Sequence, residues 1–195
     1  MIVLISISVL ISIKDLWVIN LKEPEVCLRI AMDYIKKGLT EETVFVSLDG
    51  AHIKTKDDVH FDIFRFLKEN GIEKVDGILD RWQGEYQISG YIPKINISSM
   101  PGIGDVNIIL PTGKKLRIEC KKGKENKSGQ EYPLMREAIG QLMTSFELTD
   151  DIIPVVAVPF SEKAYTLASK WSQYTQMKQL GIKFFLVKED DIMII

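Results

Sequence analysis

Two short segments in the last third of the chain, one almost wholly apolar and one with an apolar centre, limit the folds that it can adopt. They are DIIPVVAVP (151–159) and IKFFLVKED (182–190). A strand that is apolar on both sides needs cover on both faces, as in a sheet that is flanked by helices. A helical segment, EKAYTLASKWSQYTQMKQLG (162–181), separates the two, and PLMREAIGQLMTSFEL (133–148) precedes the first. Helices that alternate with apolar strands predict crossover connections between parallel strands of one mixed sheet.

The first half of the chain predicts further elements of the same kinds. PEVCLRIAMDYIKKG (24–38) has the pattern of an amphipathic helix that ends at a glycine, and TVFVSL (43–48) that of a strand. KDDVHFDIFRFLKENG (56–71) predicts another helix, with acidic residues at its start. Residues 73–100 predict one or two strands with turns.

The N-terminal segment MIVLISISVLISI (1–13) alternates apolar residues with serines, as a half-buried strand does. It lacks a basic region and a cleavage site, and it is too short for a helix that spans a bilayer, so we expect no membrane partner. We therefore predict two parts. Residues 1–55 form a strand-helix extension, which extends the sheet or mediates association between copies, and residues 56–195 form the core.

The composition excludes several classes of site and partner. The 195 residues, 46% of them hydrophobic, suit one domain with a sizeable core. A net charge of -2 argues against binding to a polyanion through bulk positive charge. Cys27 and Cys120 lie far apart without a CxxC motif, so we expect neither a disulfide framework nor a zinc knuckle, and we expect a reducing, intracellular (cytoplasmic) location. His52 and His60 are too few for a multi-histidine site, which leaves oxygen ligands for any metal.

The segment GDVNIILPTGKKLRIECKKG (104–123) predicts a β-hairpin with one apolar and one charged face. Side chains in a strand alternate between its two faces. Glu119 and Lys121 therefore share one face of the second strand. The opposite face carries the apolar residues Leu116, Ile118 and Cys120.

The length of the hairpin loop decides where Asp105 lies relative to Glu119. A two-residue turn at 112–113 would put the two carboxylates on opposite faces. A three-residue loop at 111–113, with Gly113 in the left-handed conformation, would place Asp105 directly opposite Glu119. We favour the three-residue loop because it makes the other face of both strands consistently apolar, as a buried sheet requires.

Two carboxylates so close to one another repel, and burial increases the cost. A divalent cation removes the conflict, and Mg²⁺ prefers oxygen ligands. Asp105 and Glu119 are thus candidate ligands of Mg²⁺, and Lys121 would stand beside the attacking water. The alternative is an ordinary solvent-facing strand, but a sheet that is covered on both faces has no such surface.

These residues resemble the motif of the PD-(D/E)xK nuclease superfamily, which has the restriction-endonuclease-like fold. Asp105, Glu119 and Lys121 stand at the motif's three positions, and Gly104 replaces its proline. KSGQEYPLMREAIGQL (127–142) is similar to the helix that follows the motif in Holliday-junction-resolvase-like, RecB-like and virus-type members, in which a glutamine often points at the site. The resemblance spans roughly residues 56 to 190.

The resemblance implies a three-layer α/β/α fold with a central mixed sheet, and Mg²⁺- or Mn²⁺-dependent hydrolysis of phosphodiester bonds in DNA. It also implies roles for individual residues. Asp105 and Glu119 would bind the metal with the backbone carbonyl of Cys120, and Lys121 would align or activate the water. Gln141, or less well Gln130, would point into the site. An acidic residue of the first core helix often joins the site in this family, and the candidates here are Asp58, Asp62 and, less well, Glu69.

A local basic patch is expected to bind the phosphates of DNA. Its residues are Lys114, Lys115, Arg117, Lys122, Lys124, Lys127 and Arg136. The expected function is that of an endonuclease or exonuclease, acting for instance on a junction or flap during DNA repair, recombination or replication. A homodimer would present two sites to two strands. The alternatives are a non-cleaving nucleic-acid-binding or assembly module with the same fold, a structural hairpin in an unrelated protein, and, for the patch, a solvated loop.

Overall fold

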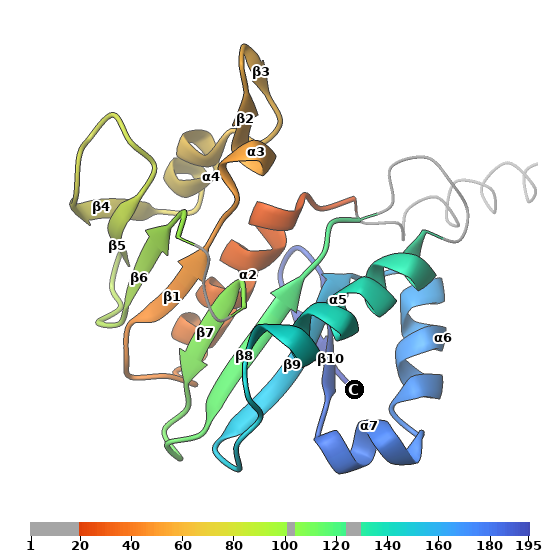
Figure 1. Cartoon of the computed structure of the whole chain (residues 1–195). Coiled ribbons are helices and arrows are strands. Elements are labelled where there is room, and N and C mark those ends of the chain that lie inside the picture. The colour runs from red at the N-terminus through yellow and green to blue at the C-terminus, as the bar shows by residue number, and fades with distance from the viewer. Residues whose placement is uncertain (1–19, 101–103, 124–129) are drawn as a thin grey trace, which may run out of the picture.

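A nine-stranded sheet forms the centre of the protein in a computed structural model that describes residues 20–100, 104–123 and 130–195 (Figure 1). The strand order is β11-β10-β9-β8-β7-β1-β6-β5-β4. Of the eight neighbouring pairs, five are antiparallel, and β1/β6, β8/β9 and β9/β10 are parallel. The protein is therefore a mixed α/β protein with a large, mostly antiparallel central sheet and several helices. The strand predicted at 1–13 lies outside the described residues.

The described residues form the following elements. The strands of the sheet are β1 (Val44–Ser47), β4 (Ile72–Asp76), β5 (Gly84–Ile88), β6 (Lys94–Ser98), β7 (Val106–Ile109), β8 (Lys115–Cys120), β9 (Ile152–Pro159), β10 (Lys183–Val187) and β11 (Ile192–Ile194). The helices are α2 (Glu23–Lys36), α3 (Gly50–Ile53), α4 (Ile63–Glu69), α5 (Glu131–Ser145), α6 (Glu162–Trp171) and α7 (Thr175–Leu180). A separate hairpin consists of β2 (Lys54–Thr55) and β3 (Asp58–Val59), and it projects away from the sheet (Figure 1).

Helices cover both faces of the sheet. Val155 and Ala157 of β9 belong to the buried cluster that contains the apolar residues of α2. Val156 and Val158, which alternate with them, belong to a second cluster with α5 and α6. Because neighbouring side chains of a strand point to opposite faces, α2 lies on one face and α5 and α6 lie on the other. The prediction that 151–159 is a strand buried on both faces is confirmed.

Residues before position 56 occupy a place in the fold that differs from the predicted extension. β1 lies inside the sheet, where it is parallel to β6 and antiparallel to β7. α2 contributes eight buried residues to the main core cluster. Without β1, the facing edges of β6 and β7 would carry unpaired backbone groups, and without α2 one face of the sheet would be exposed. These elements are therefore integral to the same core as the later ones.

Several local boundaries also differ from the prediction. The helix expected at 56–71 begins only at Ile63, where the side chain of Asp62 accepts a hydrogen bond from the backbone N–H of Arg65 (3.0 Å) and caps the helix. The residues before it form the β2/β3 hairpin, which turns at Lys56 with a φ of 53°. The helix expected at 162–181 is interrupted between α6 and α7. Strand β11 was not predicted.

The register of the β7/β8 hairpin is the one that the apolar pattern favours. Val106 pairs with Ile118, and Ile108 pairs with Leu116. The loop has three residues, because the N–H of Leu110 donates to the carbonyl of Lys114 across it (2.8 Å). Gly113 closes the loop with a φ of 82°. The prediction of a three-residue loop with a left-handed glycine is confirmed.

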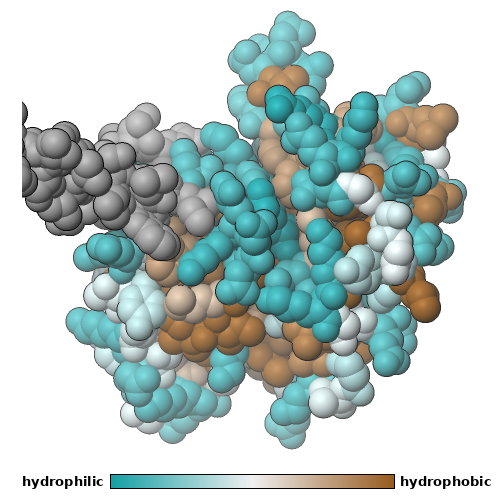
Figure 2. Space-filling view, turned by 180° about the vertical axis from the view of Figure 1, so that it is seen from behind, coloured by the Kyte–Doolittle hydropathy of each residue, from teal (hydrophilic) through white to brown (hydrophobic). Residues whose placement is uncertain are grey.

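On the side of the sheet that α2 covers, the surface is hydrophilic over the middle of the molecule and more hydrophobic below it (Figure 2). The apolar side chains of α2 point inward, which leaves charged residues such as Lys36 on its outer side. Within the described ranges, no helix has the length and apolar character that crossing a membrane requires.

The left-handed glycine of the hairpin gives a test of this register. Gly113→Ala adds a Cβ at positive φ, so we expect a free energy of unfolding that is lower by about 1 kcal/mol. Gly140→Ala in α5 is the matched control, because a Cβ there meets nothing within 4 Å and an alanine stabilises a helix by about 0.5–1 kcal/mol. Urea denaturation of both variants measures the difference. Equal effects of the two substitutions would contradict the loop conformation.

Candidate functional site

The candidate site lies beside the ends of central strands of the sheet, where β1, β6 and β8 end and β7 begins. The backbone N–H of Ser47 donates to the carbonyl of Asp105 (2.8 Å), and that of Leu48 donates to Ser98 (2.8 Å). These bonds hold the strand ends together beside a cleft of about 420 Å³. The cleft is lined by Ser47, Leu48, Asp49, Ser99, Gly104, Asp105, Glu119, Gln141 and Ser145. The cleft thus collects side chains from three strand ends and from α5.

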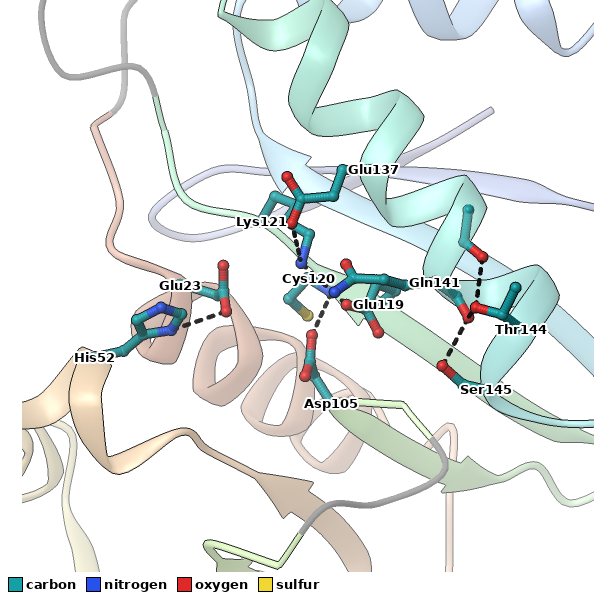
Figure 3. Close-up of polar contacts among 11 residues, drawn as sticks. Glu23, His52, Asp105, Glu119, Cys120, Lys121, Glu137, Gln141, Thr144 and Ser145 are labelled. Atoms are coloured by element: carbon teal, nitrogen blue, oxygen red, sulfur yellow. Dashed lines mark hydrogen bonds and ion pairs between the residues drawn. The ribbon is translucent and has the colours of Figure 1, made fainter.

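Asp105 is fixed against the end of β8 by two hydrogen bonds. Its backbone N–H donates to the carbonyl of Ile118 (2.8 Å). Its carboxylate Oδ2 accepts a hydrogen bond from the backbone N–H of Cys120 (2.7 Å; Figure 3). The preceding Gly104 has a φ of 89°, and a Cβ there would lie 3.1 Å from the carbonyl oxygen of Ile118. A glycine at this position therefore allows the close approach that orients Asp105.

Glu119 and Lys121 stand together on the face of β8 that α5 covers. Each is only 6% exposed. The Lys121 Nζ lies 3.0 Å from Oε1 of Glu119 and 3.5 Å from Oε1 of Glu137, a residue of α5 (Figure 3). The sheet and α5 therefore enclose an ammonium group between two carboxylates, one buried and one half-exposed.

The carboxyl groups of Asp105 and Glu119, which both line the cleft, have raised pKa values. Burial raises the pKa of Asp105 to about 7, with a further contribution from the charge of Glu119, although the hydrogen bond from Cys120 lowers it. Burial likewise raises the pKa of Glu119, and the charge of Lys121 partly offsets this. The site therefore holds negative charge at an energetic cost that a bound cation would remove.

Lys121 keeps its proton. Burial acts to lower the pKa of Lys121, but the charge of Glu119 and its hydrogen bond raise that pKa above the ordinary value for lysine. At neutral pH the side chain is an ammonium group. It can stabilise negative charge, and it cannot accept a proton while it remains in this state.

Gln141 extends from α5 toward the strand that carries Glu119 (Figure 3). It lines the cleft, and its Oε1 is buried and has no hydrogen-bond partner within the described part of the chain. A buried acceptor of this kind needs a donor, which a bound water would supply. Gln130 lies just before α5 begins, outside the residues that line the cleft.

Three ligand atoms beside the cleft could hold a metal ion. The Sγ atoms of Cys27 and Cys120 and a carboxylate oxygen of Asp105 all lie within 4.8 Å of one another. Burial raises the pKa of Cys27 to about 11 and that of Cys120 well above its ordinary value, so both thiols are neutral at pH 7. Asp105 thus belongs both to this cluster and to the cleft that Glu119 lines.

The structure places the acidic candidates from the predicted helix 56–71 elsewhere. Asp58 is an exposed residue of β3, Asp62 caps α4, and Glu69 pairs with Arg65 (2.8 Å). None of them lines the cleft. Helix α4, which Asp62 caps and to which Glu69 belongs, contributes no residue to the lining of the cleft.

Glu23, in the first turn of α2, is the acidic residue that sequence reasoning missed. Its negative charge acts to raise the pKa of Asp105 and of Glu119. Its Oε1 lies 2.9 Å from Nδ1 of His52, on the α2 side of the cleft (Figure 3). The signal that could have found it is a glutamate before a proline at a helix start, but nothing local shows that this helix adjoins the hairpin.

The members of the predicted basic patch that the structure describes lie on different elements. Lys114 and Lys115 lie at the loop end of the hairpin. Lys115 precedes Glu119 by four positions along β8, a length of strand of about 13 Å. Lys115 pairs with Asp151 (2.9 Å), and Arg117 donates to the side chain of Asn107.

The other members of the predicted patch are spread over different elements. Arg136 stacks over the ring of Tyr132, 5.4 Å from its centroid. Lys122 is exposed directly after the site residues. Lys124 and Lys127 lie outside the described residues. Among the described members of the predicted patch, Lys122 lies nearest in sequence to the candidate site, because it directly follows Lys121.

Comparisons of the chain with protein-family models, with curated proteins and with solved structures found no match. The chemistry of the cleft is therefore the basis on which a function can be proposed. That chemistry consists of one half-buried and one buried carboxylate, one unpaired amide oxygen, and a buried ammonium group beside them.

The raised pKa of Asp105 predicts the pH dependence of stability in metal-free protein. The folded state binds a proton more tightly than the unfolded state, so this contribution to stability is complete below about pH 4 and is lost as pH rises through 7. Between pH 5 and pH 8 we expect the free energy of unfolding of the wild type to fall by about 1 kcal/mol or more relative to that of Asp105→Asn. Urea denaturation in EDTA measures both. Parallel curves for the two proteins would contradict the proposed environment of Asp105.

Proposed function

We propose that this protein is a metal-dependent deoxyribonuclease with a restriction-endonuclease-like fold. The observation that carries the proposal is that Asp105 and Glu119 line one cleft at the strand ends, while the ammonium group of Lys121 lies 3.0 Å from the Glu119 carboxylate. Acidic pairs with a neighbouring lysine suit the hydrolysis of phosphodiester bonds, in which a cation and a positive side chain both counter developing negative charge.

The donor set fits a hard divalent cation, Mg²⁺ or Mn²⁺. The carboxylates of Asp105 and Glu119 would hold it, together with the backbone carbonyl of Cys120. Both carboxyl groups have raised pKa values because burial and negative charges oppose their ionisation, and a cation relieves that cost. When bound, such a cation acidifies water and neutralises charge on a phosphate.

The protein's own residues would position the reactants. Lys121, held as an ammonium group by Glu119, would donate hydrogen bonds to the attacking water or to a phosphate oxygen. The unpaired Oε1 of Gln141 would accept a hydrogen bond from that water and orient it. Glu137, half-exposed beside Lys121, would fix the ammonium group from the side of α5.

A nucleic acid is the substrate class that suits the site. Most of the lining of the cleft is polar, and exposed Lys122 lies next to it, where it can contact a phosphate. A module that binds nucleic acid without cutting it gains nothing from buried acidic groups beside the phosphates, which favours cleavage over the binding alternative.

A cleavage panel tests this function. Labelled linear duplex, single-stranded, flap and four-way-junction DNA are incubated with Mg²⁺, Mn²⁺ or EDTA. We expect cleavage of at least one substrate with either metal and none in EDTA. Glu119→Gln and Lys121→Met should each lower the rate by about 100-fold or more, because the first removes a carboxylate that would hold the metal and the second removes the positive charge beside the reacting phosphate.

Two matched variants control for the loss of a charge in the same sheet. Glu85 and Lys94 form a half-buried pair 2.8 Å apart on β5 and β6, and neither residue lines the cleft. Glu85→Gln and Lys94→Met should leave the rate within about twofold of the wild type. Absence of metal-dependent cleavage on every substrate, or full activity of both site variants, would refute the nuclease proposal.

The role of Glu23 is open to a separate test. Its negative charge near Asp105 and Glu119 adds to the attraction for a cation, so Glu23→Gln should raise the Mg²⁺ concentration for half-maximal cleavage by about 3–10-fold. Glu25→Gln is the matched control on the same helix turn, because Glu25 pairs with Arg29 (2.7 Å). An equal Mg²⁺ requirement in the two variants would exclude Glu23 from the site.

A further inference from the structure

A pair of thiols lies directly beneath the cleft. Cys27 belongs to α2 and Cys120 is the last residue of β8, so residues 93 positions apart in the chain meet in the core. They are 1% and 0% exposed, and a hydrogen bond joins the two thiols. Both are free cysteines. A pair of buried thiols packed only for shape would have no reason to adjoin a carboxylate.

Asp105 connects this pair to solvent. Its carboxylate oxygen and the two Sγ atoms lie within 4.8 Å of one another, and the same residue lines the cleft. The Oδ2 atom is held near the thiols because it accepts the N–H of Cys120 itself (2.7 Å). A cation that enters the cleft therefore reaches the sulfur atoms past Asp105, without crossing the rest of the core.

The ligand chemistry of this cluster differs from that of the adjoining carboxylates. Mg²⁺ takes oxygen ligands and has little affinity for sulfur. Thiolates favour softer cations such as Zn²⁺, which binds tetrahedrally and often through three protein ligands and one water. On binding, each thiol releases its proton to solvent, and the resulting thiolates with the carboxylate offset the charge of the cation.

We propose that Cys27, Cys120 and Asp105 form a second metal site, which binds a soft divalent cation such as Zn²⁺ and shares Asp105 with the hard-cation site. Occupation by the soft cation turns the Asp105 carboxylate toward sulfur and away from Glu119. The two metals then compete. Binding itself is independent of the proposed function, whereas the consequence that Zn²⁺ inhibits Mg²⁺-dependent cleavage rests on it.

Cadmium binding tests the site without any activity. Cys27 and Cys120 are the only cysteines of the chain, so ultraviolet thiolate-to-cadmium charge-transfer absorption reports on them alone. Reduced, metal-free, full-length protein is titrated with Cd²⁺ while circular dichroism monitors the fold. We expect saturation at one Cd²⁺ per chain with a native spectrum, and weaker binding when Mg²⁺ is present in excess.

Three variants separate the ligands. Cys27→Ala and Cys120→Ala should each lower the affinity for Cd²⁺ at least tenfold and reduce the charge-transfer absorption per metal. Asp105→Asn keeps both thiols and should also lower the affinity at least tenfold, so it decides the matter if a cysteine variant fails to fold. Asp49→Asn, which removes another carboxylate of the cleft, is the control and should bind like the wild type.

The results that overturn the site are specific. They are the absence of charge-transfer absorption in the folded wild type, unchanged affinity in Asp105→Asn, or absorption that appears only as the protein unfolds. The activity arm compares inhibition by Zn²⁺ in the wild type with that in Cys27→Ala, in which inhibition should require at least tenfold more Zn²⁺. A wild type that binds Cd²⁺ but never cuts DNA would refute the nuclease proposal and leave the metal site standing.

Discussion

The repulsion between the Asp105 and Glu119 carboxylates, next to the ammonium group of Lys121, is the constraint on which the rest of the structure depends. Within the described residues, Lys121 is the positive charge that contacts Glu119, and burial raises the pKa of both carboxyl groups. A fold that holds these repelling carboxylates must gain stabilising free energy from other parts of the structure. The two large apolar clusters on either face of the sheet do this, because they bury most of the apolar side chains of the central strands.

Backbone geometry, more than side-chain packing, places Asp105. Gly104 lies so close to β8 that a Cβ would approach the Ile118 carbonyl oxygen to 3.1 Å, and its φ of 89° is one that other residues rarely adopt. Asp105 then forms hydrogen bonds to β8 through both its N–H and its carboxylate. The glycine that stands where the PD-(D/E)xK motif has a proline therefore has a physical reason in this chain. It lets the strand start closer to its neighbour than a larger residue would allow.

The hairpin could be predicted from the sequence because its information is local. Period-2 alternation sets the faces of the strand, and a consistent apolar face then selects the register that the structure has. Glu23 and the meeting of Cys27 with Cys120 could not be predicted in this way. Both depend on which helix covers the sheet beside β8, and an amphipathic pattern at 24–38 shows that a helix buries one face but not against which strand. For the same reason β1, whose short pattern resembles that of an edge strand, is found between β6 and β7.

The position of Asp105 between two kinds of ligand follows from the same alternation. Along β8, Glu119 and Lys121 face α5, whereas Cys120 between them faces α2 and meets Cys27. Asp105 directly precedes β7, outside the paired residues of the hairpin. Its carboxylate accepts the backbone N–H of Cys120, which lies between these two faces. One oxygen atom can approach sulfur while the other remains on the side of the cleft. A single carboxylate at the end of a ladder can thus take part in two sites of different chemistry, and because it cannot satisfy both fully, the occupation of one must weaken the other.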